Sequence, residues 1–193
     1  MDEIQAVTIV AKRKIFARLS ITAGNVVQLV GIFAADLALQ WSRSTSSSSL
    51  AFAAMFLSWL LLYFSCHGIA HWILGRTVGI RFLHYTIGGT ANPQGWPLGL
   101  RWIFEHLPFF GVQTEKVSMQ DASPKAKALM WSAGVTSSAI VPALSVFVAW
   151  GSGVPGSGWF LVFALVWSLS TLASNWTSPT GDYAKARRAL KTS

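Results

Sequence analysis

The sequence predicts an all-α membrane protein with four transmembrane helices in a single domain of residues 1–193. Of these residues, 52% are hydrophobic and only 11% are charged, which is far from the composition of an average soluble domain. The apolar residues also gather in four long runs, and each run approaches the roughly 20 residues that a helix needs to cross a bilayer core. One cysteine, Cys66, is present, so no intramolecular disulfide can form.

The four predicted spans are residues 19–41, 50–74, 128–150 and 159–176. The second span is the most clearly defined, because the first contains Asp36 and the fourth is the shortest. "SRSTSSSS" joins the first pair and "GSGVPGSG" the second, and both stretches are typical of short turns outside the hydrocarbon core.

The basic residues indicate how the spans are oriented. They precede the first span, recur through the connection 76–127 and follow the fourth span, whereas Arg43 is the only base in the other two connections. By the positive-inside rule, the N-terminal segment 1–18, the connection 76–127 and the tail 177–193 are cytoplasmic. This distribution explains the net charge of +8 without a nucleic-acid partner, and it suits contact with anionic membrane lipid.

The connection 76–127 is predicted to hold a strand and a re-entrant segment. "TVGIRFLHYTI" alternates in the period of a strand, and "GGTANPQGWP" breaks it with turn residues. "LGLRWIFEHLPFFGV" follows; it is amphipathic and too short to cross a bilayer, so a re-entrant or interfacial helix is expected there.

Two histidines near the cytoplasmic end of the second span are the main candidate for chemistry. His67 and His71 are four residues apart and therefore share one helix face. The fourth span runs in the same direction, and Asp182, the only nearby carboxylate, follows it. Two imidazoles and one carboxylate can form an open zinc site. Two alternatives remain: ligation of a tetrapyrrole by a histidine, or packing histidines with Asp182 paired to Lys185 in a solvated tail.

The order of these features resembles the site-2 protease family of intramembrane zinc metalloproteases. That family has a His-Glu-x-x-His helix leading into a strand and a Gly-Gly, and "HGIAHWILGRTVGIRFLHYTIGG" has this layout. Its second core helix follows a proline and bases and holds an Ala-Gly, as "SPKAKALMWSAGV" does. Its third core helix ends in an asparagine, proline and aspartate, as "NWTSPTGDYAKARRAL" does. The similarity covers residues 50–190 and implies a site-2 protease-like core with the first span added.

The resemblance implies that His67, His71 and Asp182 are zinc ligands, but the catalytic residue is missing. Gly68 stands where the family has the glutamate that takes a proton from zinc-bound water. Glu105 is the one candidate substitute base. The shortened aspartate motif further predicts that zinc binds weakly or is absent.

These departures predict a catalytically inactive pseudoprotease that serves as a binding, regulatory or structural subunit of a membrane complex. A transmembrane protein partner is expected to pair along residues 78–87, through Val78, Ile80 and Phe82, and to approach Asn175. The alternatives are an active intramembrane zinc metalloprotease with a substituted base and a pigment- or haem-ligating membrane subunit.

Overall fold

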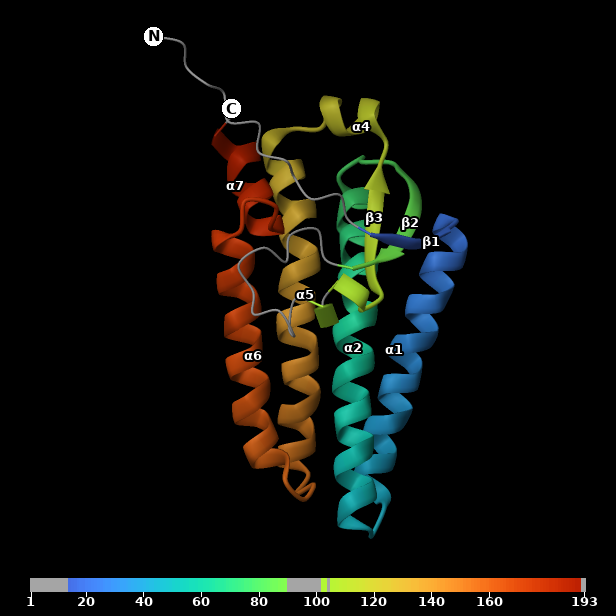
Figure 1. Ribbon diagram of the computed structural model, residues 1–193, viewed down its shortest axis with the longest axis vertical. Helices are drawn as coiled ribbons and strands as arrows, with labels where there is room; N and C mark the ends of the chain where they lie inside the picture. Colours follow the sequence, from blue (N-terminus) through green and yellow to red (C-terminus); the bar gives the residue numbers. More distant parts are fainter. Residues whose placement is uncertain (1–13, 90–101, 104, 192–193) are drawn as a thin grey trace.

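Four long helices dominate the structure, a computed structural model that describes residues 14–89, 102–103 and 105–191. These helices are α1 (Ile21–Ser44), α2 (Ser48–Thr77), α5 (Pro124–Gly151) and α6 (Ser157–Thr177), and each is long and apolar enough to cross a membrane. They run side by side along the molecule, and α5 lies between α2 and α6 (Figure 1). The prediction of four candidate spans is therefore confirmed, with bounds that differ from the predicted ones by four residues or fewer.

The helices begin and end at residues with ordinary capping roles. Ser20 caps α1, because its hydroxyl accepts a hydrogen bond from the backbone N–H of Ala23 at 3.2 Å. Ser123 caps α5 in the same way, and Pro124 occupies the first turn, where its missing N–H costs nothing. Gly79 lies in the turn directly after α2 and has a φ of 86°, a left-handed conformation that favours glycine.

Three antiparallel strands form a small sheet at one end of the helices, in the order β1-β2-β3. They are β1 (Ile15–Leu19), β2 (Phe82–Gly88) and β3 (Phe109–Thr114). The sequence predicted one strand, beginning near Val78, and this is wrong in two respects. β2 begins only at Phe82, because the turn at Gly79 must first reverse the chain. β1 and β3 come from segments predicted as an N-terminal tail and as part of a re-entrant helix.

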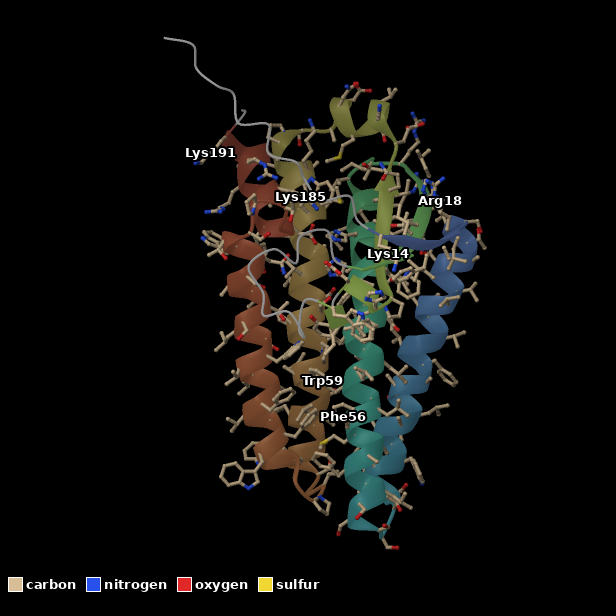
Figure 2. All side chains as sticks on the ribbon, in the orientation of Figure 1. Lys14, Arg18, Phe56, Trp59, Lys185 and Lys191 are labelled. Carbon is tan, nitrogen blue, oxygen red and sulfur yellow. The ribbon has the colours of Figure 1, made fainter. Side chains whose placement is uncertain are left out.

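Two shorter helices, α4 (Lys116–Asp121) and α7 (Asp182–Lys191), lie at the same end as the sheet (Figure 1). Within the predicted re-entrant segment, residues 102–103 and 105–106 are also helical. The helix α7 lies within the basic tail predicted at 177–193, for which no secondary structure was predicted. Its acidic first residue and basic last turn complement the helix dipole. Figure 2 shows that the labelled bases Lys14, Arg18, Lys185 and Lys191 gather at this end, away from the middle of the long helices.

Aromatic side chains bridge α2 and α6 in the middle of the long helices. The Trp59 ring lies 5.6 Å from that of Phe160, 5.8 Å from that of Phe163 and 6.1 Å from that of Trp167, all in edge-to-face geometry. Figure 2 places the labelled Trp59 well below the sheet. Trp167 of this layer also lines the cavity beside the histidine pair.

Candidate metal centre

Three side chains from two distant parts of the chain meet between α2 and α7. His67 and His71 project from α2, and Asp182 begins α7. The Nε2 atoms of the two histidines are 3.2 Å apart, and they lie 3.2 Å and 3.3 Å from the Oδ2 atom of Asp182. His71 and Asp182 are buried, with 3% and 8% of their surfaces exposed. The structure thus brings together the three residues that the sequence predicted to lie on the same side of the membrane.

Hydrogen-bond accounting assigns the tautomers of both imidazoles. Nδ1 of His71 lies 2.7 Å from the backbone carbonyl of Met130, which can only accept, so this nitrogen carries the proton. Nδ1 of His67 lies 3.0 Å from the hydroxyl of Ser138, which itself donates to the carbonyl of Gly134. Nδ1 of His67 is therefore also the donor. Each neutral imidazole then directs an Nε2 lone pair at the other and at the Asp182 carboxylate.

Three hydrogen-bond acceptors converge in this arrangement, and a cation is needed to hold them together. The cation can be an extra proton on one imidazole or a metal ion. Zinc with bonds of about 2.0–2.1 Å in a tetrahedron has its ligand atoms about 3.3 Å apart, which matches the observed 3.2–3.3 Å. Metal-bound histidines also donate their second ring N–H to a carbonyl or hydroxyl. The donor set therefore fits zinc, and its close spacing suits a small ion better than a tetrapyrrole.

Gly134 provides the space for His71. A Cβ atom at position 134 would lie 2.1 Å from Nε2 of His71, far inside any normal contact. The Ala-Gly of α5 is therefore the point where that helix passes directly against the imidazole. Sequence reasoning found this glycine through the family resemblance, but no signal in the sequence identified the Met130 carbonyl or the Ser138 hydroxyl.

Several contacts hold Asp182 at the start of α7. The backbone N–H of Asp182 donates to Oδ1 of Asn175 at 3.3 Å. Nζ of Lys185 donates to Oδ1 of the Asp182 carboxylate at 2.8 Å. Burial opposes ionisation of this carboxyl group, but its contacts with His67 and His71, which favour the carboxylate when an imidazole is protonated, outweigh burial and hold the pKa of Asp182 well below its ordinary value. Asp182 is thus a carboxylate with one oxygen facing Lys185 and the other facing the imidazoles.

Gly68 faces away from the histidine pair and towards the helix α1. A Cβ atom there would lie 2.7 Å from Oε1 of Gln28 on α1 and 3.0 Å from Cε1 of Tyr85 on β2. Gln28 and Tyr85 are fully buried. The Tyr85 hydroxyl donates to Oδ1 of Asn25 at 2.7 Å, which links β2 to α1 above this glycine. Position 68, where the resemblance would place a catalytic glutamate, thus packs against α1 and β2.

A cavity of about 800 Å³ opens beside the three residues. One wall is β3, the last strand of the described sheet, through residues 109–113. The opposite wall is the polar face of α6, through Ser170, Thr171 and Ser174. Aromatic rings of α2, α5 and α6 line its interior, and His67, His71, Asp182 and Lys185 lie along it.

The other predicted site residues are placed differently. Glu105 is not among the residues that line the cavity or form the acid–histidine group. Val78 and Ile80 lie in the turn before β2, and the Phe82 ring packs against Gly75. Both edges of β2 are already paired, with β1 and with β3, so a partner strand has no free edge there.

Asn175 lines the cavity, but its amide is engaged within the protein. Its Oδ1 atom accepts from the backbone N–H of Asp182, and its Nδ2 atom donates to the carbonyl of Thr171 at 3.0 Å. Asn175 therefore links the end of α6 to the start of α7.

Comparisons of the chain with family models, with curated proteins and with solved structures find no significant match. The resemblance to site-2 proteases consequently depends on the sequence motifs quoted above and on the geometry of this site.

Proposed function

We propose that this protein is a metal-binding, catalytically inactive relative of the site-2 proteases that binds a segment of a membrane partner in the cavity. The observation that carries the proposal is the convergence of three lone pairs on one point, with both histidine Nδ1 atoms already committed as donors. In this proposal His67, His71 and Asp182 hold zinc. The bound ion would polarise a fourth ligand on the cavity side.

Gly68 supports binding rather than turnover. A general base must lie within hydrogen-bond distance of the proton that it abstracts, and the site has no side chain to fill this role at position 68. Because a side chain at position 68 would point towards Gln28 and Tyr85, no small movement would bring a base at this position to the histidine pair. Losing a general base removes about two to four orders of magnitude of rate.

The walls of the cavity support an extended peptide segment as the occupant. In the part of the chain that the structure describes, β3 is the outer strand of the sheet, and such strands can pair with an added strand through backbone hydrogen bonds. The hydroxyl-bearing face of α6 lies across the cavity from β3 and offers polar groups to the other side of such a segment. The proposal therefore moves the expected partner contact from β2, where both edges are paired, to β3.

The orientation expected from the sequence is part of the same proposal. The bases labelled in Figure 2 lie at the end that carries the sheet and α7, and the positive-inside rule assigns this end to the cytoplasm. The metal centre would then lie near the cytoplasmic surface, where metal ions and an unwound partner segment can reach it.

The proposal is tested with the purified full-length chain and a panel of transmembrane peptides. We expect these peptides to bind without cleavage above the level of a His67→Ala variant. Binding should weaken when Val112→Pro removes a backbone donor from β3, and a Val117→Pro change in the short helix α4, outside the cavity, provides a control for general damage. Zinc-dependent cleavage that is lost in Glu105→Gln would overturn the inactive assignment.

A further inference from the structure

Lys185 is placed so that its charge acts on the candidate metal centre. It lies one turn after Asp182 on α7, where that helix meets α5, and is labelled in Figure 2. Its Nζ atom is 2.8 Å from Oδ1 of Asp182 and 4.4 Å from the centre of the Trp131 ring. The ion pair and the cation–π contact together hold the ammonium group beside the cavity.

We propose that Lys185 is an internal cation that competes with a metal ion for Asp182 and keeps the metal affinity of the site low. This inference depends on the proposed metal site and adds a specific role for a residue that the family motifs do not include. One oxygen of the carboxylate faces Lys185 and the other faces His67 and His71. A metal ion on the second oxygen would be separated from the ammonium group by one carboxylate.

Two opposing effects decide the sign of the result. Lys185 orients the carboxylate, and loss of an orienting partner costs about 10- to 100-fold in metal affinity. Its positive charge also repels a divalent ion, and charges a few ångströms apart in a partly buried site interact strongly. The orientation has independent support, because Asn175 Oδ1 accepts from the Asp182 backbone N–H and the carboxylate is largely buried. The charge effect should therefore dominate.

Lys185→Gln separates these effects, since glutamine can still donate to Asp182 but carries no charge. Lys185→Arg retains the charge. Arg187→Met is the matched control, because Arg187 is on the same helix but contacts the Trp176 ring and carbonyl instead of Asp182. Each full-length variant is purified in detergent, and zinc affinity is measured by competition with a fluorescent chelator.

We expect Lys185→Gln to bind zinc about 10- to 100-fold more tightly than the wild type, by the Coulomb argument. Lys185→Arg and Arg187→Met should stay within about threefold of the wild type, because one keeps the local charge and the other removes a distant, screened charge. Zinc should also raise the Tm of Lys185→Gln more than that of the wild type at the same zinc concentration. Lys185→Met provides a second uncharged variant if the glutamine protein does not fold.

The possible failures are distinguishable. Equal or weaker zinc binding by both uncharged variants, with measurable binding by the wild type, would overturn the role of Lys185 and leave the metal site standing. No zinc binding by any variant would overturn the metal site and this inference with it.

Discussion

Gly134→Ala is the substitution that most directly probes the contact between α5 and the histidine pair. The added Cβ would lie 2.1 Å from Nε2 of His71, and ordinary contact begins near 3.4 Å, so the imidazole has to move by roughly 1.3 Å. Ligand distances in a metal site tolerate only about 0.2 Å. The same movement would break the 2.7 Å bond from His71 to the Met130 carbonyl.

We therefore expect Gly134→Ala to lower zinc affinity by at least about 100-fold, since it displaces a ligand and an outer-shell defect alone costs 10- to 100-fold. Overpacking should also destabilise the protein by about 1–3 kcal/mol, partly offset by roughly 1 kcal/mol of helix propensity. Zinc affinity is measured by chelator competition and stability by thermal unfolding in detergent.

Gly151→Ala is the matched control on the same helix. Apart from its chain neighbours and the backbone of its own helix, no atom of the described residues lies within 4 Å of a Cβ at this position. It should leave zinc binding unchanged. The reasoning is refuted if Gly134→Ala and Gly151→Ala bind zinc equally well, since Gly134 would then not confine His71.

Three further predictions address the base position, the sheet and the topology. Gly68→Glu should destabilise the protein by about 1–3 kcal/mol through overpacking against α1, and peptidase assays should show no gain of cleavage; restored cleavage would contradict the described packing. Burial raises the pKa of Tyr85 to about 12, so its stabilising effect should be complete below pH 10 and be lost as the pH rises through 12. The difference between the alkaline absorbance titrations of wild type and Tyr85→Phe gives the pKa of Tyr85, and an ordinary value near 10 would argue against burial of its ring. Single cysteines at Ser152 and Lys191, in a background without Cys66, should be labelled from opposite sides of the membrane; labelling from one side would contradict the four-span topology.

The four long helices were predictable because length and hydropathy are properties of each segment alone. The sheet was only partly predictable, since β1 and β3 are defined by pairing with β2 across long stretches of chain. The aromatic residues of β3 also fit the pattern of an amphipathic helix, which explains why the predicted helix was extended to residues 109–112. Residues 102–103 and 105–106 of that segment are helical, and residues 98–101 lie outside the described part of the chain. The helix α7 was missed because its bases suggested a solvated tail, although Asp182 in the first turn and Lys191 in the last are typical of a capped helix.

The candidate site was predictable to the level of its three central side chains. The four-residue spacing places His67 and His71 on one face, and the parallel direction of α2 and α6 brings Asp182 to the same end. The surrounding partners were not predictable, because a backbone carbonyl such as that of Met130 has no sequence signal. From the sequence, pairing of Asp182 with Lys185 is an alternative to the histidine contacts; in the structure both occur together, because Lys185 binds the second carboxylate oxygen.

Zinc K-edge X-ray absorption on the zinc-loaded protein tests the central claim most directly, because it reports the atoms bound to the ion. The account predicts a four-coordinate ion with nitrogen and oxygen ligands at about 2.0–2.1 Å, including the scattering pattern of two imidazoles. In His71→Ala one of these imidazoles should disappear from the spectrum. An ion surrounded by six oxygen atoms, or a spectrum unchanged by His71→Ala, would contradict the assignment of His67, His71 and Asp182 as a metal centre.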